Sequence, residues 1–174
     1  MRLGLAAVAA GCLALTGCSL QQDVASKPLD AGPAGGQAAP QLRGRLVDGG
    51  TFDLAAARGR PVVINFFATW CGPCHHEQPG LNQVAVRYAG RVSLVGVDMM
   101  ESAAQVSGFQ HAESVPYGAL IDGDGSLASA FNVPAPPVLL VVDSNGRIAK
   151  TYLGEVTVEG LSTTLDSLLA RPKA

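Results

Sequence analysis

The chain has 174 residues, a formal net charge of −2 and 48% hydrophobic residues, which suit one ordinary domain with a buried core. This charge balance argues against the clustered basic surface of a nucleic-acid-binding protein, so no nucleic-acid partner is expected. Cys12 and Cys18 lie near the N-terminus, and Cys71 and Cys74 form the one close pair in the body of the chain. The pair has the spacing of half a zinc site, but no second pair follows it, and we expect no metal or other cofactor.

The N-terminus has the features of an export signal. Arg2 is followed by an apolar run from Leu3 to Leu15, which is about 13 residues long. A transmembrane helix needs ~20 residues, so the run suits a secretory signal better. It ends in Leu15-Thr16-Gly17-Cys18, which resembles the bacterial lipobox, where the signal peptide is cut before a cysteine that is then lipidated. The resemblance implies a signal peptide over 1–17 and an extracytoplasmic protein anchored to a membrane through lipid on Cys18. An ordinary cleaved signal with incidental cysteines is the alternative.

The segment after the signal is predicted to be a flexible tether over residues 18–41, followed by one folded domain over 42–171. The run from Ala31 to Gly36 is Ala-Gly-Pro-Ala-Gly-Gly, and large apolar side chains are few. Such a composition forms a core poorly. A tether of this kind suits a lipid-anchored domain that must reach other proteins.

The domain alternates strand and helix patterns. A strand is predicted over Leu42–Val47, before the turn Asp48-Gly49-Gly50, and the apolar run Val62–Phe67 is typical of a strand buried on both faces. The remaining strands are predicted at 92–97, 119–121, 138–142 and 147–153, and the helices from the cysteine pair to 88 and at 101–112, 127–131 and 158–169. This order predicts an α/β fold with a mixed central sheet and helices on both faces.

The cysteine pair follows a buried strand and opens a helix, within Trp70-Cys71-Gly72-Pro73-Cys74. Two intervening residues let the sulfurs meet across the first helical turn. Cys71 falls at the helix N-terminus, where unpaired N–H groups and the helix dipole stabilise a thiolate. We therefore predict that Cys71 is the nucleophile and that Cys74, one turn in, is the more shielded resolving thiol. A structural disulfide or half a metal site is the alternative.

The run from Val62 to Pro79, VVINFFATWCGPCHHEQP, is similar to the signature of the TlpA/ResA-like branch of the thioredoxin superfamily. The resemblance covers roughly Gln41 to Leu169. It implies a thioredoxin-like fold and an extracytoplasmic thiol–disulfide oxidoreductase. The implied partners are exported proteins with disulfides or thiols, apocytochrome c among them, and a membrane thiol electron carrier; we expect a monomer.

The resemblance also implies a role for Glu77, three residues after Cys74 and therefore its neighbour on the helix. The family often has an acid here that handles thiol protons. Partial burial would raise the pKa of Glu77 and let it exchange a proton with Cys74; a solvated carboxylate is the alternative. Asn65 stands where cytosolic thioredoxins have a buried Asp, and Asn cannot accept that proton, which leaves Glu77.

The family's substrate-binding residues fall on the cysteine loop and on a proline loop. Pro137 aligns with the family's cis-proline, and Pro136 before it lacks the N–H that relatives offer to a bound peptide. The resemblance implies that substrate contacts Trp70, Gly72, Pro73, Pro136 and Pro137.

His75 and His76 follow the pair, and Pro79 is predicted to kink the helix beyond them. An imidazolium near a thiolate would stabilise it, although exposed side chains are the commoner outcome at such positions.

Three functions stay open on sequence alone. The Gly-Pro dipeptide between the cysteines resembles reducing thioredoxins and favours a reductant of exported protein disulfides, cytochrome c maturation included. The others are a disulfide-donating oxidase and a thiol-dependent binding module or chaperone without turnover.

Overall fold

The computed structural model describes residues 29–30 and 36–171, which form a six-stranded mixed sheet, a separate hairpin and four helices in that part of the chain. The sheet order is β1-β8-β7-β4-β5-β6, and β2 pairs with β3 in the hairpin. The strands are β1 (Leu29–Asp30), β2 (Arg43–Arg45), β3 (Thr51–Asp53), β4 (Val62–Phe67), β5 (Ser93–Met99), β6 (Ala119–Asp122), β7 (Val138–Val142) and β8 (Ile148–Leu153). The helices are α1 (Gly72–Arg87), α2 (Ala103–Ala112), α3 (Ser126–Ala130) and α4 (Val158–Leu169).

The central strands run in both directions, as predicted. β4 and β5 are parallel, as are β5 and β6, whereas β4 pairs antiparallel with β7 and β7 antiparallel with β8. The parallel pairs follow from the helical crossovers α1 and α2, while the antiparallel pair β7–β8 needs only the turn around Gly146. The predicted α/β fold is confirmed.

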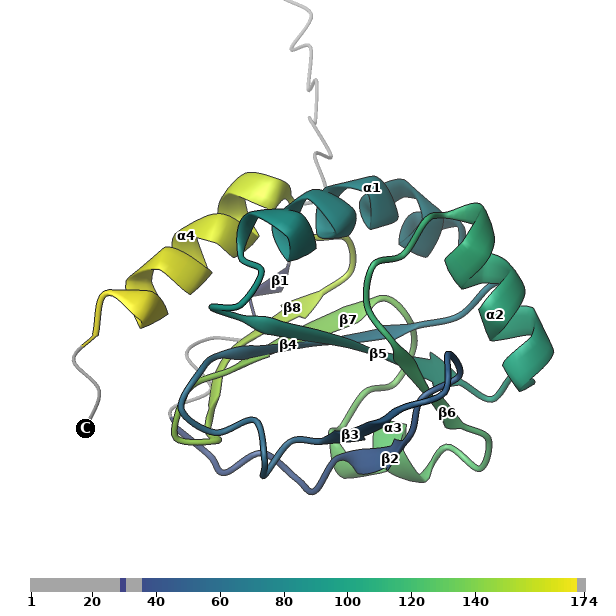
Figure 1. Ribbon diagram of the computed structural model, residues 1–174, viewed down its shortest axis with the longest axis horizontal. Helices are drawn as coiled ribbons and strands as arrows, with labels where there is room; N and C mark the ends of the chain where they lie inside the picture. The colour runs from purple at the N-terminus through teal and green to yellow at the C-terminus, as the bar shows by residue number, and fades with distance from the viewer. Residues whose placement is uncertain (1–28, 31–35, 172–174) are drawn as a thin grey trace, which may run out of the picture.

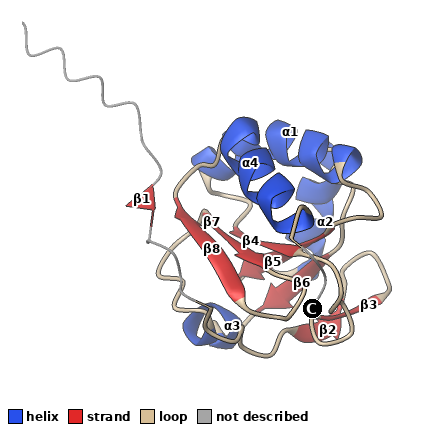
Figure 2. Cartoon of the chain, turned by 90° about the vertical axis from the view of Figure 1, so that its left-hand side faces the viewer, coloured by secondary structure: helices blue, strands red, loops and turns tan. Residues whose placement is uncertain are grey.

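Helices cover both faces of the sheet, but unequally. Figures 1 and 2 show α1, α2 and α4 on one face, and the short α3 with the β2–β3 hairpin on the other. Successive side chains of a strand point to opposite faces, so Ile64 and Phe66 join the core on the α3 side while Val63 packs beneath α1 and α4. Asn65 shares the face of Val63, which places this buried amide under α1.

The folded domain begins earlier than residue 42, its predicted boundary. The Gln37 carbonyl accepts the Ile148 N–H at 2.8 Å, and the Ala39 N–H donates to Gly146 at 2.9 Å. β1 also pairs with β8. Without these contacts, the outer edge of β8 would leave backbone groups unpaired. Residues N-terminal to position 42 supply the partners. The predicted signal peptide, Cys18 and most of the predicted tether lie outside the described residues.

The predicted strand at 42–47 is divided in the structure. Arg43 to Arg45 pair with β3, whereas the Val47 N–H donates to the Ala119 carbonyl at 2.9 Å. The hairpin therefore reaches across to the start of β6 and covers that end of the core.

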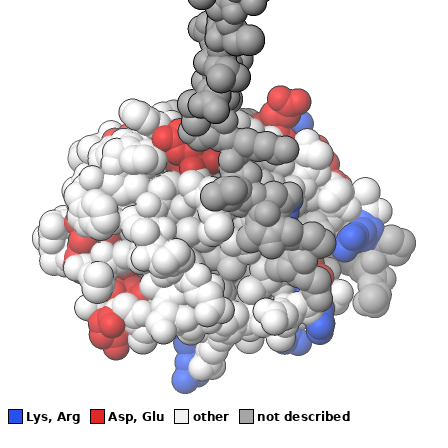
Figure 3. Space-filling view, turned by 180° about the vertical axis from the view of Figure 1, so that it is seen from behind, with Lys and Arg blue, Asp and Glu red and all other residues white. Residues whose placement is uncertain are grey.

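Most of the surface seen in Figure 3 that belongs to the described residues is uncharged. On this face the acidic side chains lie mainly at the left and top, and the Lys and Arg side chains mainly at the bottom and right. Within residues 29–30 and 36–171, no helix combines the length and apolarity needed to cross a membrane.

Candidate active site

The cysteine pair lies where β4 ends and α1 begins. Cys71 is the N-cap residue of α1, and its Sγ accepts the Cys74 N–H at 3.2 Å. The two cysteines form a disulfide, with their Cα atoms 5.3 Å apart. Pro73 fits the first turn because N–H groups there have no partner within the helix. The local sequence thus places one sulfur at the positive end of the α1 dipole.

The disulfide is buried behind an exposed rim. Cys71 and Cys74 are 4% and 1% exposed and pack in an apolar cluster with Phe67 and Phe109. Trp70, by contrast, is 69% exposed. Gly72 and Pro73 are also exposed. A partner that approaches Cys71 therefore meets these three rim residues first.

The proline loop lies at the same end of the sheet. The peptide bond between Pro136 and Pro137 is cis, and β7 starts at the next residue. Phe66 in β4 is the register partner of Val138, so Pro137 lies beside the end of β4 that leads into the cysteine loop. Pro137 is buried and Pro136 is half-buried. The fold thus brings together the two loops that the sequence assigned to substrate binding.

Glu77 is a buried carboxyl one helical turn beyond Cys74. It is 5% exposed; its Oε2 accepts the Val156 N–H at 3.0 Å, and its Oε1 has no hydrogen-bond partner among the described residues. Burial raises the pKa of Glu77 to about 7, against the opposing effect of the Val156 bond and with a further contribution from the charge of Glu155. This environment is not that of a solvated helix carboxylate.

A neutral polar network lies beside Glu77 beneath α1. Asn65 and Gln78 donate to the Tyr117 hydroxyl at 3.4 and 3.0 Å. Burial raises the pKa of Tyr117 to about 12, against the effect of these hydrogen bonds. The phenol stays protonated at neutral pH, and amides do not titrate. Among these four side chains, Glu77 is therefore the one that changes charge near neutrality.

Comparison with known proteins places this site in a family. The sequence model of the family described as Redoxin matches residues 34–169. The chain belongs to the redoxin family. Thioredoxin-like protein YneN of Bacillus subtilis (strain 168) is 31% identical over 154 residues, which cover 87% of this chain and 89% of the relative. Thiol-disulfide oxidoreductase ResA of Geobacillus thermodenitrificans is 29% identical over 134 residues, covering 76% and 77%.

A solved structure gives the same answer. A secreted Mycobacterium tuberculosis disulfide oxidoreductase, described as homologous to DsbE of E. coli, superposes with a TM-score of 0.66 at 26% identity. The match covers 74% of this chain and 96% of that one. The thioredoxin-like fold and the ResA-type resemblance are confirmed. With its Cys71–Cys74 disulfide, this redoxin is a thiol–disulfide oxidoreductase of the ResA/DsbE type.

Sequence reasoning missed Thr69 and Glu101 in this redoxin. Thr69 donates its N–H and its hydroxyl to the two carboxylate oxygens of Glu101, each at 2.5 Å. Glu101 follows β5, and the Glu101 N–H donates to Asp98 at 3.0 Å. Burial and the neighbouring Glu101 raise the pKa of Asp98. The order of the strands could have indicated this contact. Phe67 and Asp98 are register partners in parallel strands, so the loops that follow β4 and β5 leave the same edge of the sheet.

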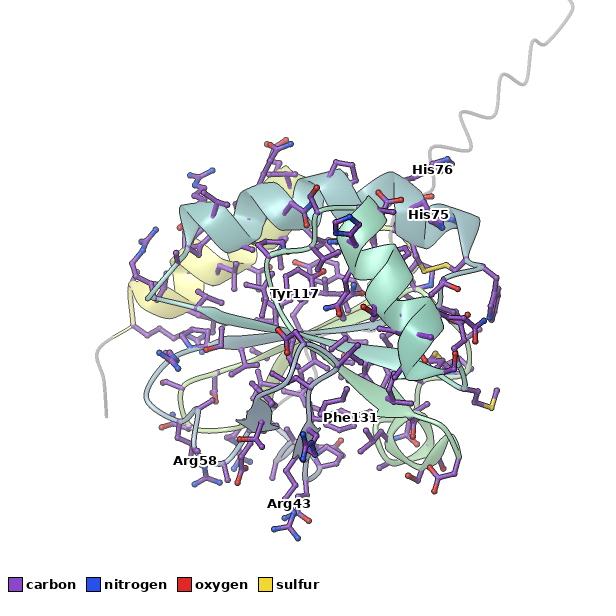
Figure 4. All side chains as sticks on the ribbon, turned by 45° about the vertical axis from the view of Figure 1, so that its right-hand side comes forward. Arg43, Arg58, His75, His76, Tyr117 and Phe131 are labelled. Carbon is purple, nitrogen blue, oxygen red and sulfur yellow. A yellow bond between two sulfur atoms is a disulfide. The ribbon has the colours of Figure 1, made fainter. Side chains whose placement is uncertain are left out.

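The two histidines diverge, as Figure 4 shows. The His75 ring faces α2, where it lies 4.9 Å from the Phe109 ring. His76 is exposed, and its Nδ1 lies 3.5 Å from Glu155. α1 continues as helix through Pro79 to Arg87, although Pro79 has no N–H to donate to the His75 carbonyl.

Proposed function

We propose that the protein reduces disulfide bonds of exported proteins outside the cytoplasm, with Cys71 as the attacking thiol and Cys74 as the resolving thiol. The observation that carries this proposal is the disulfide at the N-terminus of α1 with the buried Glu77 one turn behind it. Backbone N–H groups and the helix dipole favour a thiolate on Cys71. Cys74 has no such cap position and is the less exposed residue of the two.

The exchange proceeds in two displacements. In the reduced protein, the Cys71 thiolate attacks one sulfur of the target disulfide; the target S–S bond breaks and the other target sulfur leaves as a thiolate, which takes a proton. Cys74 then loses its proton and attacks the Cys71 sulfur. The bond between Cys71 and the target sulfur breaks, this second target sulfur leaves as a thiolate that takes up a proton, and the Cys71–Cys74 disulfide forms. Two electrons have moved from the protein to the target, and a separate thiol donor must return them.

Glu77 is proposed to hold the proton that Cys74 loses. Its Oε1 is free of hydrogen bonds among the described residues, and a pKa of about 7 lets the carboxylate accept and release a proton near neutrality. The neighbouring Asn65 and Tyr117 are poor acceptors because an amide does not take up a proton and the phenol stays protonated.

The direction and the location of the reaction rest on the sequence. Gly72-Pro73 resembles the dipeptide of reducing thioredoxins. The N-terminal apolar run and Cys18 support export and lipid anchoring, and a solved relative is described as secreted. Apocytochrome c is one class of target with thiols that must be kept reduced, so we include cytochrome c maturation among the proposed roles.

Alkylation of the fully reduced protein tests the assignment of the attacking thiol. We expect iodoacetamide to label Cys71 well before Cys74 near neutral pH, because only Cys71 occupies the N-cap. The matched variants Cys71→Ser and Cys74→Ser separate the two rates. Faster labelling of Cys74 would reverse the assignment.

The same preparation distinguishes a reductant from its two alternatives. We expect a reduction potential nearer to that of thioredoxin, about −270 mV, than to that of DsbA, about −120 mV. A value at the DsbA end would favour the oxidase. Multiple turnover with a small disulfide is expected, and a single stoichiometric reaction would instead favour a binding module.

A further inference from the structure

Every polar atom of Thr69, two residues before Cys71, takes part in a hydrogen bond. Glu101 accepts the Thr69 N–H and hydroxyl, and the Thr69 carbonyl lies 2.9 Å from His75 Nε2. Trp70, between Thr69 and Cys71, is largely exposed and contributes little packing. Cys71 is also held through its own N–H, which donates to the Ala68 carbonyl at 3.2 Å, so Thr69 is one of the residues that fix the chain leading into the helix.

The His75 ring lies between two hydrogen-bond acceptors. Its Nδ1 is 2.6 Å from Glu113 Oε1, and its Nε2 is 2.9 Å from the Thr69 carbonyl oxygen. A neutral imidazole can donate from only one nitrogen, whereas an imidazolium donates from both. The geometry thus selects the imidazolium. The bonds to Glu113 and Thr69 raise the pKa of His75, in spite of the opposing effect of burial.

Residues at both ends of helix α2 contact Thr69 and His75. Glu101 directly precedes the N-cap Ser102, and Glu113 is the C-cap residue. Between them, the Phe109 ring lies 4.9 Å from His75 and 5.1 Å from Phe67. One helix therefore holds the chain before Cys71 through Glu101 and the chain after Cys74 through Glu113.

The charges near His75 come from several elements. Glu113 faces it from α2, and Glu101 with Asp98 lies on the far side of Thr69. Burial opposes ionisation of Glu101, but the hydrogen bonds from Thr69 outweigh it and lower its pKa. His76, the next residue of α1, is turned toward Glu155 instead. His75 is thus the cation that is linked through Thr69 to the cysteine loop.

We propose that His75, held as an imidazolium between Glu113 and the Thr69 carbonyl, is a positioning residue that fixes the Thr69–Cys71 segment and favours the thiolate of Cys71. The inference rests on the proposed function, in which Cys71 is the attacking thiol. A cation near a thiol favours its ionised form. Because the thiolate exists only after reduction, His75 also stabilises the reduced protein relative to the disulfide.

The test compares His75→Gln with the matched control His76→Gln in the full-length reduced protein. The rate of Cys71 alkylation by iodoacetamide is measured from about pH 4 to about pH 9, a range that spans perturbed Cys values. We expect His75→Gln to raise the midpoint, so that alkylation at about pH 6 slows by roughly 3- to 10-fold while the rates at high pH converge. The equilibrium with glutathione should shift toward the disulfide by a similar factor. His76→Gln should follow the wild type.

Superposition of the His75→Gln curve on that of the wild type would overturn the inference. Should His75→Gln fail to fold, Glu113→Gln tests the same point, because it removes the carboxylate charge that favours the imidazolium and should raise the midpoint in the same direction. An unchanged midpoint in Glu113→Gln would then count against the proposal. The wild-type protein separates this failure from that of the proposed function: if wild-type Cys71 reacts no faster than Cys74, the proposed function fails first, and the inference with it.

Discussion

Glu77 shows how one residue acquires chemistry from its surroundings. The side chain is 5% exposed, and burial raises its pKa from the ordinary value of 4.5 to about 7. A helix carboxylate in water would be fully ionised at neutral pH and useless as a proton carrier for a thiol. Burial of the side chain changes this property, because its effect on the pKa outweighs the opposing effect of the hydrogen bond from Val156.

We predict that Glu77→Gln slows disulfide exchange near neutral pH, because Gln keeps the size and removes the titration. General acid–base help is typically worth 10²–10⁴-fold, and thiol exchange needs less of it, so a loss of no more than about 100-fold is expected. Turnover with a small disulfide measures the effect, and Glu159→Gln, an exposed carboxylate on α4, is the control. Identical pH–rate curves for Glu77→Gln and wild type would make Glu77 a structural residue only.

The same variant should alter stability with a defined sign. The folded-state pKa of Glu77 lies above its unfolded value, so the native protein holds the proton more tightly. The contribution of Glu77 to the free energy of unfolding is fully present below about pH 4.5 and is lost as pH rises through about 7. Relative to oxidised Glu77→Gln, the oxidised wild type should lose up to about 3 kcal/mol of unfolding free energy between these values. Urea denaturation at both pH values measures the difference, and a gap that does not change with pH would contradict the assigned pKa.

At the scale of elements, the site is a set of strand ends and helix ends. β4 carries the chain into the N-cap of α1, and β7 begins at the proline loop. The two ends of α2 contact Thr69 in the cysteine loop and His75 in the first turn of α1. Close packing of β5 against β4 keeps these ends in place. A Cβ at Gly96, in the middle of β5, would lie 2.8 Å from Phe67 Cε1 and 3.1 Å from the Ala119 Cβ.

We therefore predict that Gly96→Ala destabilises the domain by about 1–3 kcal/mol, because the Phe67 ring must move within a packed cluster. Strand propensity alone would favour Ala over Gly at this position. Gly108→Ala in α2 is the matched control: nothing lies within 4 Å of the added Cβ, and a gain of about 0.5–1 kcal/mol is expected. Chemical denaturation of both variants decides the matter, and a stabilised Gly96→Ala would show that the contact relaxes freely.

At the scale of the whole molecule, the domain is joined to its proposed anchor by a short segment. Leu29 pairs with Leu153 of β8, and Cys18 stands 11 residues earlier (29 − 18). An extended chain spans at most 3.3–3.6 Å per residue, so a lipid on Cys18 would lie within roughly 40 Å of the β8 edge. A lipid-anchored domain would therefore work close to the membrane surface, where exported proteins emerge.

We predict that Cys18→Ser releases the protein from membranes into the soluble fraction, because several acyl chains anchor firmly whereas none remain in the variant. Cys12→Ser is the control and should stay on the membrane, since Cys12 lies inside the apolar run. Fractionation of cells that express each variant, with mass measurement of the mature wild-type chain, tests the prediction. A membrane-bound Cys18→Ser, or a mature chain without lipid, would contradict it.

Much of the architecture is readable from local patterns. The run Val62–Phe67 forms a strand in which every residue is buried, the segment Val158–Leu169 forms a helix with the predicted bounds, and Cys71 caps α1. These features depend on periodicity, on Pro and Gly, and on the groups left unpaired at a helix start, all of which act between residues close in sequence.

The partners of the site residues, by contrast, were decided by tertiary structure alone. Glu77 is linked to Val156 across 79 positions, Thr69 to Glu101 across 32, and His75 to Glu113 across 38. No local preference specifies such pairs, because they arise only when sheet order and helix packing bring distant loops to the same edge. The amino-acid sequence by itself determined the four-residue motif Cys71-Gly-Pro-Cys74 and its place at the start of a helix. Only the folded chain, by burying Glu77 and placing His75 between two hydrogen-bond acceptors, determined the protonation states on which the proposed chemistry of this motif depends.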